Sequence, residues 1–314
     1  MRWVTYLSAT DGAERVGLVD GEEIRGLRRP GRLVDLLGDD GERLARAAED
    51  ARRDPLEVLP LSSATLRAPV PVPPSIRDFM AFEAHVRNAR GGSELDPAFY
   101  DAPVFYFTNP AAVLGPHDDV PVSPGSVAFD YELELGAVVG RAGADLDPAE
   151  AEQHIAGYLV FCDWSARDLQ RAEMRHGLGP AKGKDGATTL GPVLVTPDEL
   201  APYRRGKGFE LRASVTVNGR PFTTSSAEDP LWSFGEMLAY ASRGTRLVPG
   251  DVVGSGTVGT GCILELSTLH GAEAYPWLRP GDEVHVSVEV LGDLRVTVVE
   301  GAPVRPLPRA AGRG

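Results

Sequence analysis

The sequence predicts an α+β fold in which mixed sheets curl around one site. Alternating apolar and polar residues indicate strands at 130–140, 211–226 and 283–299, so the second half is rich in strands. Long helical patterns are few, and two of them cover 79–90 and 231–242. The chain has 314 residues, of which 42% are hydrophobic and 25% charged, enough for one large domain with an appendage.

The N-terminal part reads as a separate small α/β unit. Residues 2–25 form short strands joined by polar turns, and residues 33–53 have the apolar spacing of an amphipathic helix. Four prolines between positions 69 and 74 hold the following stretch extended, which favours a domain boundary. We therefore expect a small N-terminal domain over 1–68, a large domain over 69–308 and a tail over 309–314.

Charge and composition exclude several classes of function. A net charge of −13 argues against a nucleic-acid or anionic-membrane partner. The N-terminus has no signal-peptide core, and no apolar run reaches membrane-spanning length, so the sequence predicts a cytoplasmic protein. Cys162 and Cys262 both lie in apolar runs, which favours two buried, reduced thiols over a disulfide.

The strand at 130–140 carries the strongest chemical signal. Its period of two places Glu132 and Glu134 on one face, and side-by-side carboxylates repel each other unless a positive charge lies between them. A hard divalent cation suits a set of oxygen ligands, and Asp163 is the natural third ligand. The alternative is an exposed strand that carries two solvated glutamates.

Two helical segments contribute further candidates. Ser75 to Asp78 resembles a capped helix start, and a helix at 79–90 would put Asp78 and His85 on one face, two turns apart. Taken alone, these residues favour a cap and a surface histidine. A second helix continues from Trp164 to Gln170 and projects Arg167 and Gln170 from one side, although Arg167 could also simply neutralise neighbouring acids.

Two glycine-rich stretches resemble nucleotide-binding motifs, and neither fits. The run at 254–259 has the spacing Gly-x-Gly-x-x-Gly, but the residues after it, 261–266, read as a strand and not as the required helix. The run at 178–185 is one residue short of a phosphate-binding loop. Glu265, alone on its apolar strand, needs a hydrogen-bond partner or a raised pKa.

Together these motifs carry a resemblance to a known family. The matching segments are Asp130-Tyr131-Glu132-Leu133-Glu134, Asp163-Trp164-Ser165-Ala166-Arg167-Asp168, and Gly183-Lys184 followed by Thr188-Thr189-Leu190-Gly191-Pro192. Over residues 73–300 the chain resembles the fumarylacetoacetate hydrolase family. The resemblance implies a mixed β-sandwich roll, a homodimer, and a metal-dependent catalytic domain over 69–308. It further implies that Glu132, Glu134 and Asp163 bind Mg²⁺ or Ca²⁺, with Mn²⁺ as a further possibility and Asp78 as a possible fourth ligand.

The resemblance also implies roles for the other candidates. His85 would be the general base with Glu265 as its partner, and Arg167 and Gln170 would hold substrate oxygens. Lys184 aligns as the lysine of the site, with Lys182 as the alternative. Tyr106 would contact substrate, although core packing explains it equally well, and Thr257 would lie near the substrate carboxylate. Met80 stands where the family has a tyrosine, which changes the substrate pocket.

The predicted function is a divalent-metal-dependent hydrolase that cleaves a carbon–carbon bond in a dioxo acid of the fumarylacetoacetate or acylpyruvate type. His85 and Glu265 would activate water. The alternatives on the same scaffold are a decarboxylase, hydratase or isomerase of a 2-oxo acid, or a metal-binding relative without turnover.

Overall fold

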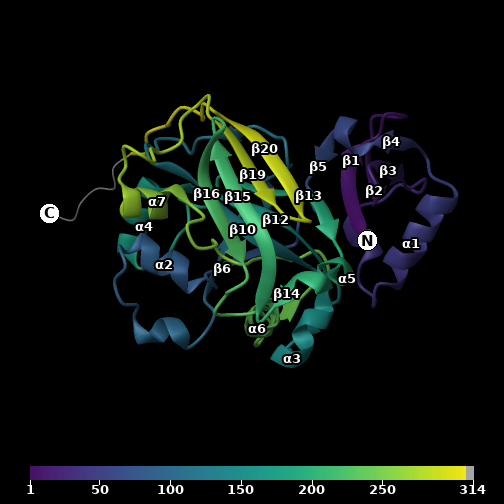
Figure 1. Ribbon diagram of the computed structural model, residues 1–314, viewed down its shortest axis with the longest axis horizontal. Helices are drawn as coiled ribbons and strands as arrows, with labels where there is room; N and C mark the ends of the chain where they lie inside the picture. Colours follow the sequence, from purple (N-terminus) through teal and green to yellow (C-terminus); the bar gives the residue numbers. More distant parts are fainter. Residues whose placement is uncertain (309–314) are drawn as a thin grey trace.

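A computed structural model describes residues 1–308 and has the predicted mixed α+β architecture, with two large sheets and short helices (Figure 1). The larger sheet has twelve strands in the described part of the chain. In order across the sheet, its main path is β4 (Val58–Pro60), β3 (Glu23–Gly26), β2 (Glu14–Asp20), β1 (Arg2–Leu7), β13 (Thr188–Val195), β12 (Ile155–Ala166), β10 (Phe129–Val139), β18 (Val252–Gly254), β6 (Ile76–Phe79) and β7 (Phe105–Thr108). Two short strands join its sides, β5 (Leu66–Arg67) beside β1 and β8 (Val113–Leu114) beside β13.

The second sheet covers one face of the first. Its path is β14 (Arg204–Arg205), β15 (Gly208–Val217), β19 (Glu283–Val288), β20 (Gly292–Val299) and β9 (Val120–Pro121), with β16 (Arg220–Ala227) beside β15. The hairpin of β15 and β16 turns at Asn218 and Gly219, as the sequence predicts. Apolar side chains of β10, among them Tyr131, Leu133 and Leu135, pack in one core with those of β15, β19 and β20. This core leaves the opposite face of β10 for the site.

Short helices lie around the sheets and at the strand ends. They are α1 (Glu42–Arg53), α2 (Glu83–Ala89), α3 (Pro148–Ala151), α4 (Arg167–Glu173), α5 (Pro197–Leu200), α6 (Phe234–Ala241) and α7 (Ile263–His270). A two-stranded sheet, β11 (Gly143–Ala144) with β17 (Arg246–Leu247), completes the fold. Within residues 1–308, no helix combines the length and the apolar character needed to cross a membrane.

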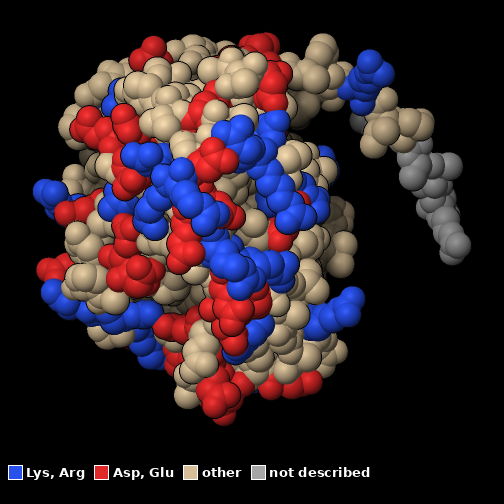
Figure 2. All heavy atoms as spheres, turned by 90° about the vertical axis from the view of Figure 1, so that its right-hand side faces the viewer, with Lys and Arg blue, Asp and Glu red and all other residues tan. Residues whose placement is uncertain are grey.

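The N-terminal segment lies at one end of the molecule, where β1 pairs with β13 and so extends the larger sheet (Figure 1). The predicted helix at 33–53 is shorter than expected, since residues 33–36 form a 3₁₀ turn and α1 begins only at Glu42. Basic and acidic side chains are interspersed on this face (Figure 2), with ion pairs such as Arg46 to Glu42 along α1. The boundary near residue 68 stays a prediction, and the expected tail at 309–314 lies outside the described residues.

Three local predictions are wrong. Residues 76–79 form strand β6 and not the start of a helix, because their backbone pairs with β18 on one side and β7 on the other. Asp78 and His85 therefore lie on a strand and on a separate helix. Trp164 to Ala166 belong to strand β12, and the helix after them begins at Arg167. Glu265 lies on helix α7, where a strand was expected.

Candidate active site

The register of the larger sheet brings the predicted metal ligands together. Glu132 lies opposite Asp163 in the β10–β12 pair, and Asp78 of β6 reaches β10 across the short strand β18. Asp78, the predicted fourth ligand, forms the tightest group with Glu132 and Glu134, and each of the three offers a carboxylate oxygen within 4.8 Å of the others. Asp163 lies outside this group and is linked to it through Tyr106 and Lys184. All four carboxylates are buried, so the alternative of an exposed strand face with solvated glutamates is wrong.

Lys184 and Tyr106 contact this carboxylate cluster directly. The Lys184 ammonium donates to Glu132, to Asp163 at 2.6 Å and to the Ser165 hydroxyl at 2.7 Å. The Tyr106 hydroxyl lies 2.6 Å from a carboxylate oxygen of both Asp78 and Asp163. Tyr106 therefore belongs to the site and is more than a core residue.

The structure distinguishes the two candidate lysines by their location. The Lys184 side chain is 4% exposed within the cluster, whereas that of Lys182 is 78% exposed and pairs with Asp185 at the surface. Of the two lysines, Lys184 is therefore the one that contacts the carboxylate cluster.

Arg167 connects the carboxylate cluster to Asp130, for which the sequence predicted no role. Its guanidinium donates to Glu132 at 2.7 Å, to Asp130 at 2.8 Å and to Gln170 at 3.2 Å. Asp130 also accepts hydrogen bonds from the backbone of Ile263 at 2.7 Å and Leu264 at 3.0 Å, the first two N–H groups of α7. It thus caps the helix that carries Glu265. Its position on the same alternating face as Glu132 was the signal available in the sequence.

His85 and Glu265 form the predicted pair despite the wrong local structure. His85 Nδ1 lies 2.9 Å from Glu265 Oε2. The other carboxylate oxygen of Glu265 accepts from the Thr260 backbone N–H at 2.7 Å and from Asn88 at 3.1 Å. These donors hold the Glu265 carboxylate in place, and it accepts a hydrogen bond from Nδ1–H of His85. The Nε2 atom of His85 then has a free lone pair.

Cys262 is a further neighbour of this pair. Its thiol donates to Glu265 Oε2 at 3.3 Å, and its sulfur lies 4.0 Å from His85 Nδ1. A backbone bridge between Glu132 and Cys262 brings this group beside the carboxylate cluster. The sequence indicated a buried thiol but not its proximity to His85.

Thr257 and Met80 differ in their exposure. The buried Thr257 hydroxyl is 3.5 Å from Glu134, which also accepts from the Gly256 N–H at 2.9 Å. Met80 follows β6 and is 39% exposed. The run at 254–259 continues from β18 without opening a helix directly, and Gly256 has a φ of +82°, where its backbone passes Phe79 and Met80.

Burial and mutual repulsion shift the ionisation of the cluster. Burial raises the pKa values of Asp78 and Glu134, the latter with a further contribution from Asp78 and Glu132. Burial also raises the pKa of Asp163 to about 7. Glu132 is the exception, because Arg167 and Lys184 overcome the effect of burial and lower its pKa. A cation bound among these carboxylates would favour their charged forms and lower the raised pKa values.

The donor set fits a hard divalent cation. Within residues 1–308, Asp78 Oδ1 and Asp163 Oδ1 are buried without any hydrogen-bond partner. Every acidic group of the cluster offers oxygen, which Mg²⁺, Mn²⁺ and Ca²⁺ prefer.

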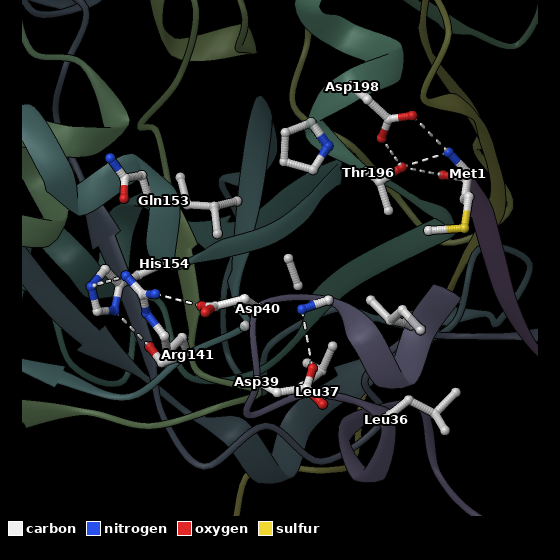
Figure 3. A pocket seen from close by; sticks show the side chains of 16 residues that line it. Met1, Leu36, Leu37, Asp39, Asp40, Arg141, Gln153, His154, Thr196 and Asp198 are labelled. Atoms are coloured by element: carbon white, nitrogen blue, oxygen red, sulfur yellow. Dashed lines mark hydrogen bonds and ion pairs between the residues drawn. The ribbon is translucent and has the colours of Figure 1, made fainter. Parts of the chain in front are cut away.

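A hollow of about 510 Å³ lies beside the N-terminal segment, between Met1, Leu36 and His154 (Figure 3). None of the predicted site residues lines it. Its polar side chains bind each other, as in the pairs of Arg141 with Asp40 and with His154. This hollow is separate from the carboxylate cluster.

Comparisons with known proteins agree with this geometry. Residues 75–299 match the family model described as fumarylacetoacetate hydrolase, C-terminal. The chain therefore belongs to the fumarylacetoacetate hydrolase family, whose members are divalent-metal-dependent enzymes acting on small molecules, among them tautomerases, isomerases and hydrolases.

Individual relatives and solved structures show which members of the family this chain resembles. The mitochondrial oxaloacetate tautomerase FAHD2A of Bos taurus is 30% identical over 267 residues, which cover 84% of this chain and 78% of the relative. Oxaloacetate tautomerase YisK of Bacillus subtilis is 29% identical over 303 residues, or 89% and 94% of the two chains. The structure of a fumarylacetoacetate hydrolase from Exiguobacterium antarcticum matches with a TM-score of 0.73 at 25% identity, over 96% of this chain and 99% of that one. A maleylpyruvate hydrolase from Sphingobium, solved with manganese and pyruvate, shares the fold with a TM-score of 0.72 at 23% identity, over 96% and 100% of the chains.

Proposed function

We propose that this protein is a divalent-metal-dependent enzyme of 2-oxo acids, and that keto–enol tautomerisation of oxaloacetate is its first candidate reaction. The observation that carries the proposal is the buried His85–Glu265 pair beside a cluster of four carboxylates. The relatives named as oxaloacetate tautomerases support the choice of substrate.

Glu132, Glu134 and Asp163 would hold the cation, with Asp78 as a further ligand. Three carboxylates favour Mg²⁺ or Mn²⁺, and participation of Asp78 would favour Ca²⁺, which accepts more oxygens. When bound, the ion would polarise the 2-oxo group and increase the acidity of the adjacent carbon.

The surrounding side chains suit an anionic substrate. Arg167 and Lys184 add two positive charges beside the carboxylates, and Gln170 lies next to Arg167. Tyr106 and Thr257 contribute hydroxyl groups, and Met80 would limit the space for the far end of the substrate. We infer that these residues bind and orient the substrate.

His85 would move the proton. With Nδ1 donating to Glu265, Nε2 accepts the proton that leaves carbon 3 of the keto acid, and the imidazolium that forms is stabilised by the Glu265 carboxylate. The oxygen on carbon 2 receives a proton in return, for which the Lys184 ammonium, held beside Asp163 and Ser165, would be the donor. Return of a proton from the His85 imidazolium to the Lys184 amine, directly or through solvent, restores both side chains, so the net change is the transfer of one proton from carbon to oxygen.

The second candidate is the hydrolysis predicted from the sequence. The same His85–Glu265 pair could take a proton from water, which would then attack the distal carbonyl of a dioxo acid. Lys184 and Gln170 would donate to the developing oxyanion, a role worth about 3 kcal/mol per donor. The likeness to the Exiguobacterium hydrolase favours this candidate. A decarboxylase would need no such base, so the pair counts against that alternative.

The test is a panel assay on metal-loaded protein. Loss of enol absorbance is followed with the enol form of oxaloacetate, with acylpyruvates and with fumarylacetoacetate. His85→Ala should lower the rate at least 100-fold, whereas His270→Ala, an exposed histidine on α7, should change it less than twofold. If metal-loaded protein is inert on the whole panel, the non-catalytic alternative replaces the proposal. The homodimer stays a prediction for sedimentation analysis.

A further inference from the structure

The group formed by His85, Cys262 and Glu265 has the composition of a transition-metal site. It offers one imidazole nitrogen, one sulfur and one carboxylate oxygen, all within 4.8 Å of one another. The neighbouring cluster offers only oxygens, so the two groups differ in the ions that they favour. Sulfur and imidazole ligands favour Zn²⁺ and Co²⁺, whereas carboxylates favour Mg²⁺ and Mn²⁺.

The separations between the three donor atoms are close to those between ligands of a tetrahedral ion. The separations are 2.9 Å from Nδ1 to Oε2, 3.3 Å from sulfur to Oε2 and 4.0 Å from sulfur to Nδ1. Ideal Zn²⁺ bond lengths at tetrahedral angles require about 3.3, 3.5 and 3.6 Å for the same pairs. Shifts of no more than about half an ångström would therefore complete the three-ligand site and leave a fourth position for water.

We propose that His85, Cys262 and Glu265 bind a thiophilic divalent cation such as Zn²⁺, separately from the carboxylate cluster, and that this ion inhibits the enzyme. Thiolate and carboxylate together balance the charge of the ion, which suits a buried position. Burial raises the pKa of the Cys262 thiol, so the ion must displace its proton, and binding releases one proton to solvent.

Inhibition follows from the tautomer of His85. An ion on Nδ1 takes the lone pair of that nitrogen, and the ring proton moves to Nε2. Nε2 is then a donor and can no longer accept a proton from substrate or water. This inhibitory step rests on the proposed function, whereas binding of the ion does not.

Binding is tested with Co²⁺ as the probe, on protein kept in excess Mg²⁺ so that the carboxylate cluster is occupied. We expect one equivalent of Co²⁺ to produce the near-ultraviolet charge-transfer absorption of a cobalt–thiolate bond. Cys262→Ser should abolish this absorption, His85→Ala should weaken Co²⁺ binding at least tenfold, and Cys162→Ser, at the other buried cysteine, should retain the absorption. Absence of the band in the unmodified protein, or its persistence in Cys262→Ser, would overturn the site.

Inhibition is tested separately with Zn²⁺ in the enol assay. We expect Zn²⁺ to inhibit turnover, and we expect added Mg²⁺ not to relieve this inhibition. The Cys262→Ser variant should require at least tenfold more Zn²⁺ for the same fractional loss of its own basal rate. Inhibition that Mg²⁺ reverses fully, with equal potency in Cys262→Ser, would place the inhibiting ion in the carboxylate cluster and contradict the inhibitory role. Because the cobalt absorption needs no turnover, failure of the proposed reaction leaves the binding test intact.

Discussion

Replacing Asp130 by Asn removes the negative charge of a side chain that contacts two separate parts of the site. One oxygen of Asp130 accepts from Ile263, and the other accepts from Arg167 and Leu264. Asn keeps the shape but has a single acceptor oxygen, so its NH₂ group must face either Arg167 or the start of α7. Two donors then oppose each other in a buried position.

The expected loss of stability can be estimated from these contacts. Breaking one side of a buried ion pair costs about 3–5 kcal/mol, and the lower end applies because Arg167 keeps Glu132. Loss of a helix cap adds about 1 kcal/mol. We therefore expect the free energy of unfolding to fall by about 3–4 kcal/mol, and turnover to fall at least 30-fold because Arg167 and Glu265 lose their common support.

Urea unfolding and the enol assay measure the two effects. The matched control is Asp168→Asn, because Asp168 accepts from Ser126 at 2.6 Å and Val127 at 2.9 Å and, within residues 1–308, pairs with no Lys or Arg side chain. The free energy of unfolding of Asp168→Asn should be about 1 kcal/mol lower than that of the unmodified protein, and its turnover should change little. If Asp130→Asn is no more destabilising than Asp168→Asn, Asp130 does not support the site as described.

Three further predictions follow from the same contacts. Lys184→Met should lower turnover by about 100-fold and the exposed Lys182→Met by less than twofold, and equal effects in steady-state kinetics would refute the choice of lysine. Gly256→Ala should destabilise the fold by at least about 2 kcal/mol in urea, since its new Cβ would lie 2.4 Å from the Phe79 carbonyl oxygen, whereas Gly12→Ala meets no atom within 4 Å and should cost less. In chelator-treated protein, the pKa of Asp163 is about 7 in the folded state and about 4 in the unfolded chain. Between these pH values the folded state binds the extra proton, so the free energy of unfolding should fall as pH rises, by up to about 1.4 kcal/mol per pH unit. Added Mg²⁺ should restore stability above pH 7, and unfolding curves that show stability rising with pH in the metal-free protein would contradict the raised pKa.

Patterns that depend on neighbouring residues were readable from the sequence. The alternation around Glu132 and Glu134 predicted both the strand and the face that carries the carboxylates, and the Asn218–Gly219 pair predicted a hairpin. These signals are local because side-chain direction in a strand and the geometry of a tight turn depend on adjacent residues alone.

Elements that depend on pairing with distant residues could not be predicted from the sequence. Residues 76–79 form a strand because β18, more than 170 residues later, supplies hydrogen-bond partners. Helix α7 begins where Asp130, from strand β10, caps its first N–H groups. The pairing of His85 with Glu265 was predicted through the family resemblance, while the spacing argument for Asp78 and His85 rested on one continuous helix, whereas α2 begins only at Glu83 and Asp78 lies on β6.

The central claim is that the buried carboxylates bind a single divalent cation. Calorimetric titration of chelator-treated protein with Mn²⁺ tests this claim most directly. We expect one Mn²⁺ per chain, at least 100-fold weaker binding in Glu134→Gln, and unchanged binding in the exposed control Glu150→Gln. Absence of binding in the unmodified protein, or equal affinity in Glu134→Gln, would contradict it.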